Sequence, residues 1–330
     1  MKVAITGATG NVGTALLRTL ADEPAVESIV GIARRLPRAH FPKTTFVRAD
    51  ISRDDLAAHV AGADCVVHLA WLIQPSHDRR TTWSTNVLGS RRVFEATAAA
   101  GVPALVYASS VGAYSPGPKE RTVDESWPTG GIATSFYSRD KADVEAILDE
   151  LERDHPGLRI VRLRPSLIFQ RAMGVEVKKL FTGPLLPHRL LEPGRIPFVP
   201  DTPRLRFQVT HTDDVADAYR RAIVGDARGA FNIAAEPVLD PDALAQLFGA
   251  RKVPMPARLL RGLVAATWRA RLQPTPEGWV DMGLQTPLLD ATRARTELGW
   301  EPRRSAGDTL LELVRGIHDH ADAPTPPLAA

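Results

Sequence analysis

The stretch that decides the fold is KVAITGATGNVG at residues 2–13, where a short apolar run leads directly into three glycines at three-residue spacing. After it, Val12, Leu16 and Leu20 recur at four-residue intervals, and this periodicity predicts one face of a helix. A glycine turn between a strand and a helix lets the backbone approach a pyrophosphate, whose charge the free N–H groups of the helix attract. The stretch therefore predicts a dinucleotide-binding turn, and the expected contacts are Gly7, Thr9, Gly10, Asn11, Val12 and Gly13.

The sequence that follows alternates short apolar runs with helical patterns. We expect strands within residues 28–33, 44–50, 64–70, 104–110 and 158–165, and long helices at about 82–100 and 136–154. Strands that alternate with helices predict a parallel sheet covered on both faces. The predicted fold class is therefore α/β, with a Rossmann-type doubly wound parallel sheet.

The pattern becomes irregular after Pro165. We expect residues 1–165 to form the dinucleotide-binding domain. Residues 166–318 should form a smaller, mixed substrate-binding lobe, whose chain returns to the Rossmann sheet around 207–234. The proline-rich segment 183–203 is typical of either a mobile lid or a rigid surface loop. Residues 319–330 are rich in Ala and Pro and are expected to be disordered.

Composition narrows the classes of function. The 330 residues are 44% hydrophobic and carry a formal charge of +3. No basic block falls on one predicted helix, so no nucleic-acid partner is expected. The single cysteine, Cys65, excludes a disulfide within the chain, and no Cys/His cluster has metal-ligand spacing, so no metal is expected. The sequence has neither a signal-peptide core nor a membrane-length apolar run, so we expect a cytoplasmic protein without a membrane partner.

The end of the second expected strand bears on the choice of dinucleotide. Ala33 stands where an acidic residue would accept hydrogen bonds from the adenosine ribose, and Arg34 and Arg35 follow it. Guanidinium groups suit a 2′-phosphate, so we expect NADP to be preferred and NAD to be the alternative. The two arginines could also belong to a solvated loop. Asp50 ends the third expected strand, where its carboxylate can hold the adenine amino group.

Tyr137 and Lys141 stand four residues apart at the start of a predicted helix, which places both side chains on one helix face. A phenol, with a pKa of about 10, is a weak base at neutral pH unless a nearby cation stabilises its phenolate and lowers that pKa. Ser110 follows the fifth expected strand, at the sheet edge where cofactors bind, and its hydroxyl can share a proton with a substrate oxygen. These three residues predict acid/base chemistry beside a nicotinamide.

Several motifs follow one another in an order that resembles the extended short-chain dehydrogenase/reductase family, also called the NAD-dependent epimerase/dehydratase family. They are TGATGNVG (6–13), HLAW (68–71), TNVLGS (85–90), LRPSLIF (163–169), HTDDVADA (211–218), FNIA (231–234) and TELGWEPR (296–303). The resemblance implies a catalytic set of Asn86, Ser110, Tyr137 and Lys141, the last two also touching the cofactor. It further implies cofactor contacts at Ile51, Leu69, Ala70, Pro165 and Ile168, and a homodimer through a four-helix interface built from residues 82–100 and 136–154.

The departures from the family pattern concern the substrate. Val111 and Gly112 follow Ser110, where the resemblance would place the two carboxylates of nucleotide-sugar 4,6-dehydratases. Phe207 stands where many sugar epimerases have an arginine for the diphosphate, and Gln170 replaces a family glycine. Arginines that could still hold a diphosphate are Arg189, Arg195, Arg204 and Arg206.

Three functions remain open at this point. The leading hypothesis is reversible hydride transfer between NADP(H) or NAD(H) and a secondary alcohol or ketone of a small metabolite, with Tyr137 as the general acid/base. In this scheme Asn86 would support Lys141 or a water. The alternative is a nucleotide-sugar epimerase similar to UDP-glucose 4-epimerase. The third is a cofactor-sensing binding protein without catalysis, although such a protein would not need both Tyr137 and Lys141.

Overall fold

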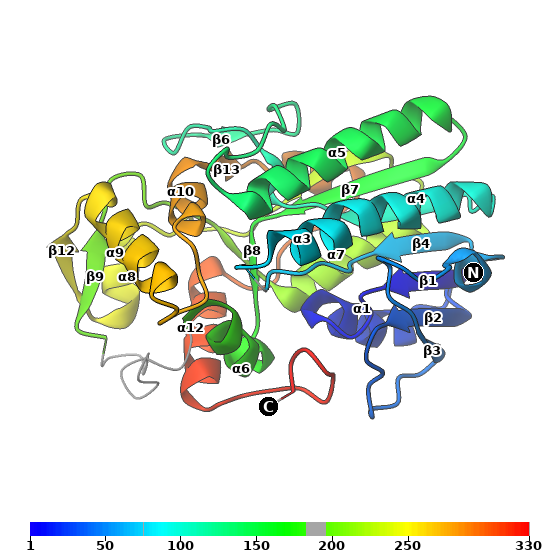
Figure 1. The fold of residues 1–330 in the computed structure, drawn as a ribbon, viewed down its shortest axis with the longest axis horizontal. Helices are drawn as coiled ribbons and strands as arrows, with labels where there is room; N and C mark the ends of the chain where they lie inside the picture. The colour runs from blue at the N-terminus through cyan, green and yellow to red at the C-terminus, as the bar shows by residue number, and fades with distance from the viewer. Residues whose placement is uncertain (75, 183–195, 330) are drawn as a thin grey trace.

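The structure is a computed structural model, and it describes residues 1–74, 76–182 and 196–329. Its centre is a seven-stranded parallel sheet in the order β11-β7-β5-β4-β1-β2-β3 (Figure 1). The strands are β1 (Lys2–Thr6), β2 (Ser28–Ala33), β3 (Thr44–Arg48), β4 (Cys65–His68), β5 (Ala104–Ala108), β7 (Arg159–Pro165) and β11 (Gly229–Ile233). The chain winds outward in both directions from β1, so the predicted Rossmann-type α/β class is confirmed.

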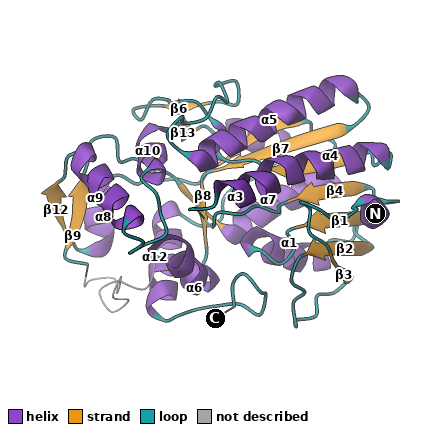
Figure 2. Cartoon of the chain, viewed as in Figure 1, coloured by secondary structure: helices purple, strands orange, loops and turns teal. Residues whose placement is uncertain are grey.

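Helices cover both faces of this sheet (Figure 2). One face packs against α1 (Asn11–Ala21) and α7 (Thr212–Val224), and the other against α4 (Gly89–Ala99) and α5 (Phe136–Asp154). Shorter helical segments are α2 (Ala57–Val60), α3 (Arg79–Trp83), η1 (Ser84–Leu88) and η2 (Val111–Ala113). Every residue of β4 is buried, because its side chains meet a helical layer on each face.

Short elements, most of them from the second half of the chain, form a smaller lobe. Its paired strands are β6 (Thr122–Val123) with β13 (Leu288–Leu289), β8 (Leu167–Phe169) with β10 (Val209–His211), and β9 (Phe198–Asp201) with β12 (Arg251–Pro254). Its helices are η3 (Arg171–Met173), α6 (Gly174–Val177), η4 (Lys178–Thr182), α8 (Pro241–Phe248), α9 (Ala257–Arg269), α10 (Gly278–Gln285), α11 (Thr292–Glu297) and α12 (Ala306–His318). The segment predicted as a lid lies largely at 183–195, outside the described residues.

The C-terminal segment 319–329 contacts the rest of the chain through Leu328 and Thr325, and its predicted disorder stays a prediction. Leu328 is fully buried in an apolar cluster with Val177, Leu313 and Ile317. Thr14 Oγ1 donates a hydrogen bond to Thr325 Oγ1 at 3.1 Å. The segment has few large apolar residues, but burial of Leu328 in the apolar site on α6 and α12 is sufficient to hold it there.

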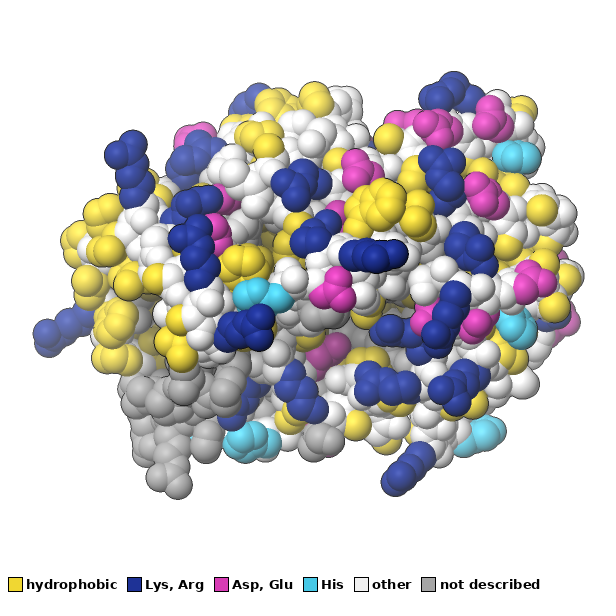
Figure 3. Space-filling view, in the orientation of Figure 1, with side chains coloured by type: hydrophobic (Ala, Val, Ile, Leu, Met, Phe, Trp, Pro, Cys, Tyr) yellow, Lys and Arg dark blue, Asp and Glu magenta, His cyan; other side chains and the backbone are white. Residues whose placement is uncertain are grey.

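Positive and negative side chains are interspersed on the surface. Lys and Arg side chains are spread over the face shown in Figure 3, with Asp and Glu between them. Of the helices in the described part of the chain, none is both long and apolar enough to cross a membrane. Helices α4 and α5 lie side by side on one face of the sheet (Figure 1). The cytoplasmic location, the lack of a nucleic-acid partner and the homodimer through residues 82–100 and 136–154 stay predictions.

Candidate functional site

The glycine turn joins β1 to α1 at the carboxyl edge of the sheet. Gly7 has a φ of 72°, and a Cβ there would lie 2.6 Å from the backbone nitrogen of Ala70. A Cβ at Gly13 would lie 2.4 Å from the carbonyl oxygen of Gly7. Gly10 donates its N–H to that same oxygen at 3.0 Å. Glycine is therefore required at two positions for the turn itself, which leaves the first N–H groups of α1 facing the sheet edge.

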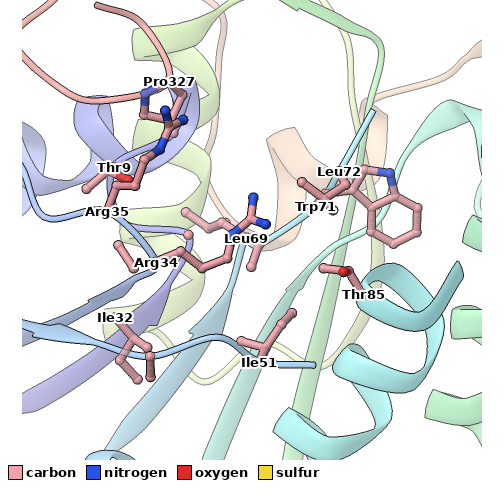
Figure 4. A pocket seen from close by; sticks show the side chains of 15 residues that line it. Thr9, Ile32, Arg34, Arg35, Ile51, Leu69, Trp71, Leu72, Thr85 and Pro327 are labelled. Carbon is pink, nitrogen blue, oxygen red and sulfur yellow. The ribbon is translucent and has the colours of Figure 1, made fainter. Parts of the chain in front are cut away.

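A first cavity of about 120 Å³ opens beside this turn (Figure 4). In Figure 4, Arg34 and Arg35 lie on one side of it and Trp71 and Leu72 on the other, with Pro327 of the C-terminal segment close to Arg35. Predicted cofactor residues that line it are Gly7, Thr9, Gly10, Arg34, Arg35, Ile51, Leu69 and Ala70. The cavity is long and partly apolar, as an adenosine moiety requires, and the glycine backbone gives it phosphate-binding N–H groups.

Asp50 lies in a neighbouring hollow and is absent from the described lining of the first cavity. This hollow is lined by Arg34, Arg35, Arg48, Ala49, Asp50, Arg53 and Asp54. Burial by itself raises the pKa of Asp50, but hydrogen bonds from Ser52 and the charges of Arg34 and Arg53 outweigh it and lower that pKa. The hollow thus combines four guanidinium groups with an ionised carboxylate, at the place where the dinucleotide ribose is expected.

A second cavity, of about 300 Å³, continues from the glycine turn toward the smaller lobe. Sequence-predicted residues that line it are Gly7, Gly10, Asn11, Val12, Gly13, Leu69, Ser110, Tyr137, Lys141, Pro165 and Ile168. The structure therefore brings together three of the four predicted catalytic residues and the turn, although they come from three separate segments. Within the described ranges, no group of three His, Cys, Asp or Glu side chains is arranged to hold a metal ion.

Tyr137 stands in the first turn of α5, which begins after Ser135 accepts a capping hydrogen bond from the Ser138 backbone. A Cβ at Gly112 would lie 2.9 Å from Tyr137 Cε1, so the glycine that departs from the dehydratase pattern makes room for this ring. Burial raises the pKa of Tyr137, and a hydrogen bond with Ser110 acts in the opposite direction. The lowering of this pKa by Lys141 stays a prediction, since burial and Ser110 are the two influences on Tyr137 in this structure.

Lys141 is buried beneath the sheet edge and points away from bulk water. Its Nζ atom donates to the carbonyl oxygen of Ala108 at 2.6 Å and to the hydroxyl of Tyr107 at 3.3 Å. The ammonium lies 3.5 Å from the centroid of the Trp71 ring, but 5.9 Å from that of Tyr137. Burial lowers the pKa of Lys141 to about 7, and nearby Glu145 and Asp140 act to raise it.

Asn86 binds the backbone of the segment that follows β4. It is fully buried and is not among the described residues that line the second cavity. Its Oδ1 accepts from the Leu72 N–H at 2.7 Å, and its Nδ2 donates to the Leu72 carbonyl at 2.8 Å. Its amide thus makes two hydrogen bonds to the Leu72 backbone. The predicted support of Lys141 or of a water by Asn86 stays a prediction.

Sequence reasoning missed the aromatic and acidic side chains of the second cavity. They include Trp71, Phe181, Trp279 and Glu176, and the first lies within a quoted motif without a role of its own. Phe181, Trp279 and Glu176 lie on η4, α10 and α6. Trp279 is far in sequence from the motif residues of the cavity, and the other two lie in an irregular segment, so no spacing signal relates them to Tyr137. Of the arginines proposed for a diphosphate, Arg204 donates to the carbonyl oxygens of Leu284 and Gly117. Arg204 and Arg206 are not among the described lining residues, and Arg189 and Arg195 lie outside the described part of the chain.

Comparison with known proteins places this geometry in context. A sequence model of the NAD dependent epimerase/dehydratase family matches residues 3–234. An uncharacterized protein of Mycobacterium tuberculosis is 26% identical over 335 residues, which cover 95% of this chain and 83% of that protein. UDP-glucose 4-epimerase of Mycolicibacterium smegmatis is 29% identical over 331 residues, covering 95% of this chain and 97% of that protein.

This chain is also similar to a steroid dehydrogenase in sequence and to a solved epimerase structure in fold. A 3-beta-hydroxysteroid dehydrogenase of Mycolicibacterium neoaurum is 30% identical over 196 residues, covering 57% of this chain and 53% of that protein. The crystal structure of Thermus thermophilus UDP-glucose 4-epimerase in complex with NAD aligns with a TM-score of 0.69 and 20% identity, covering 96% of this chain and 99% of that one. At that identity the structural likeness supports the fold alone.

Proposed function

Because the chain belongs to the NAD dependent epimerase/dehydratase family, we propose that it catalyses reversible hydride transfer between NADP(H) or NAD(H) and a secondary alcohol or ketone of a small metabolite. The observation that carries this proposal is the second cavity, in which Ser110, Tyr137 and Lys141 share one wall with the glycine turn. The turn fits a dinucleotide, because a Cβ at Gly7 or Gly13 would collide with neighbouring backbone atoms.

The residues of the cavity have separate roles in proton transfer. When bound, the nicotinamide supplies or accepts the hydride. Tyr137 exchanges a proton with the substrate oxygen, and the Ser110 hydroxyl, hydrogen-bonded to it, orients that oxygen. Because burial raises the pKa of Tyr137, its phenol is protonated at neutral pH and is suited to protonating a ketone oxygen as hydride arrives at the carbon. Lys141 holds its ammonium against Ala108 O and Trp71, within the same wall.

The arginine hollow supports the preference for NADP. Four arginines line this hollow together with Asp50 and Asp54, and planar guanidinium forks suit a phosphate dianion. The structural relative from Thermus thermophilus contains NAD, so NAD remains the alternative cofactor.

The test of the proposed reaction is Tyr137→Phe, which removes one oxygen. We expect it to bind NADP+ as the wild type does, and to lose at least about a hundredfold in turnover, the typical contribution of a general acid/base. Tyr114→Phe is the matched control, since the Tyr114 hydroxyl bonds Asn232 away from the cavity. Tyr137→Phe protein with wild-type turnover would refute the role.

A sugar epimerase is the second candidate, favoured by the UDP-glucose 4-epimerase that this chain resembles over nearly its whole length. In that reaction the same residues would oxidise a carbinol and then reduce it from the other face. Incubation with UDP-glucose distinguishes the two, because an epimerase forms UDP-galactose with no net change in the absorbance of the reduced cofactor. Net absorbance change with an alcohol or ketone favours the first candidate.

A further inference from the structure

The described wall of the second cavity is mainly apolar. Besides the glycine turn and the catalytic residues, its side chains include Ile73, Phe169, Met173, Leu180, Phe181 and Met282. Among the described lining residues the charged ones are Lys141 and Glu176, and Lys141 already donates to Ala108 O. Recognition of a phosphate uses Arg or Lys donors. This wall therefore suits an uncharged, apolar molecule better than a sugar diphosphate.

Aromatic rings line the cavity next to the Tyr137 hydroxyl. The Trp279 ring centroid lies 4.9 Å from that of Tyr137 and 5.0 Å from that of Phe181, which stands perpendicular to it. The Trp279 Nε1 atom is buried and has no hydrogen-bond partner among the described residues. A ring compound can lie against such faces and bury its apolar surface, which contributes roughly 25 cal/mol per Å² removed from water.

Glu176 is the acidic residue in this wall, and one of its oxygens has no protein partner. Its Oε2 atom is buried without a hydrogen bond to any part of the chain that the structure describes. Burial raises the pKa of Glu176 to about 7, and the positive charge of Lys179 acts in the opposite direction. A buried carboxyl without a partner costs free energy. A ligand oxygen that completes its hydrogen bonding would remove that cost.

The position of Glu176 is fixed by close packing of α6 on α12. A Cβ at Gly174 would lie 2.1 Å from the Gly316 carbonyl oxygen, so the two backbones are in direct contact. Val177 buries its side chain against Leu313 and Ile317. The carboxyl is therefore presented from a rigid element, as a residue that determines substrate specificity requires.

We propose that the second cavity binds an uncharged, mainly apolar ring compound with two oxygen functions, an alcohol or ketone that reacts at Tyr137 and a second oxygen that hydrogen-bonds the carboxyl of Glu176. The first of these assignments rests on the proposed hydride transfer. The second depends only on the cavity wall and on the unpaired Oε2 atom, so binding can be tested separately from turnover.

The experiment measures binding to the full chain with NADP+ present, through quenching of tryptophan fluorescence, since Trp71 and Trp279 line the cavity. The probes are dehydroepiandrosterone, which has a hydroxyl and a ketone on a fused apolar skeleton, androst-5-en-3β-ol, which lacks the ketone, and UDP-glucose. We expect dehydroepiandrosterone to bind the wild type about tenfold more tightly than androst-5-en-3β-ol, the ratio for one hydrogen bond of about 1.4 kcal/mol. UDP-glucose should bind more weakly than either.

Variants of Glu176 complete the test. Glu176→Leu should abolish the difference between the two sterols, whereas Glu176→Gln, which can still donate a hydrogen bond, should keep most of it. Tighter binding of UDP-glucose than of both sterols, or an unchanged sterol ratio in Glu176→Leu, would overturn the proposal. If Glu176→Leu does not fold, the order of probe affinities in the wild type and in Glu176→Gln still tests the proposal. Sterol binding without any reduction of NADP+ would contradict the proposed reaction and leave the cavity assignment standing.

Discussion

The ammonium of Lys141 lies over the ring of Trp71, with 3.5 Å between Nζ and the ring centroid. A desolvated cation over an indole is stabilised by about 2 kcal/mol, which is more than one pKa unit. Removal of the ring in Trp71→Leu should therefore lower the pKa of Lys141 further below its present value of about 7. An NMR titration of protein labelled with ¹³C at lysine Cε measures it, with Lys141→Met to assign the resonance. Trp71→Phe should give a smaller decrease, and an unaltered titration in Trp71→Leu would contradict the cation–π account.

Two glycines of the same turn should respond differently to alanine. At Gly13 the added Cβ would lie 2.4 Å from Gly7 O and 2.7 Å from the carbonyl carbon of Ala8, so the backbone must move. At Gly10 the nearest atom would be 3.4 Å away, an ordinary contact, but this glycine lines both cavities. Gly13→Ala should lose about 1–3 kcal/mol in the free energy of unfolding. Gly10→Ala should unfold like the wild type yet bind cofactor at least about tenfold more weakly.

Urea unfolding and cofactor titration of both glycine variants provide the measurement. Equal loss of stability in the two variants would mean that the turn is not held by the contact between Gly13 and Gly7.

Arg34 and Arg35 should determine which dinucleotide is preferred. Both guanidinium groups line the hollow next to Asp50, and a hydrogen bond to a charged group contributes about 1.5–3 kcal/mol. The double variant Arg34→Ala/Arg35→Ala should therefore weaken NADP+ binding by roughly ten- to a hundredfold, and change NAD+ binding by less than about threefold. Arg38→Ala is the control, since Arg38 is exposed and lies outside the described lining of the hollow. Equal weakening of both cofactors would indicate a general charge effect.

The sheet and the glycine turn could be predicted because their rules are local. Strand β4 is apolar along its whole length since it is buried on both faces, and the strand–turn–helix order at residues 2–21 specifies the connection. Ser110 was predicted for the same reason, whereas Tyr137 and Lys141 were predicted from their four-residue spacing on one helix. Parallel strands end at one edge, so residues that follow them meet there.

The rest could not be predicted because it depends on contacts between distant, irregular segments. Asn86 was assigned by motif, yet its partner is the Leu72 backbone, which only tertiary structure reveals. Trp279 and Glu176 meet Tyr137 through the smaller lobe, whose short helices carry no clear periodicity. Burial raises the pKa of Tyr137, and the burial of an individual side chain cannot be derived from residue spacing.

Glu145, on α5, is the centre of a buried ion network that joins this helix to β7. Its carboxylate accepts from Arg164 at 2.8 Å, from Arg162 at 3.0 Å and from the Ser109 hydroxyl at 2.5 Å. Glu145→Gln would leave two buried guanidinium groups underpaired, so the free energy of unfolding should fall by about 3–5 kcal/mol. Glu95→Gln, on the exposed face of α4, should change it by less than about 0.5 kcal/mol.

The same network predicts an acid-dependent loss of stability. Burial by itself raises the pKa of Glu145, but hydrogen bonds and charge from Arg164, followed by Arg162, lower it to about 2. The ordinary glutamate pKa is about 4.3, so the unfolded chain binds this proton first as the pH falls. The stabilisation is complete above that value and is lost as the pH drops toward 2. Chemical unfolding at several pH values should show the gap between wild type and Glu145→Gln narrowing in acid, and a constant gap would contradict this.

The C-terminal segment should influence how quickly the cofactor enters and leaves. Pro327 lines both cavities, and the segment is held by buried Leu328 and by the hydrogen bond between Thr14 and Thr325. Leu328→Ser removes the apolar anchor, and burial of a leucine contributes about 1.5–3 kcal/mol. Amide hydrogen exchange at residues 321–329 should then accelerate, and NADP+ should associate and dissociate faster in stopped-flow fluorescence. Pro324→Ala, at an exposed position of the same segment, should change neither. Faster exchange with unchanged cofactor rates would mean that the segment packs beside the cavities without obstructing them.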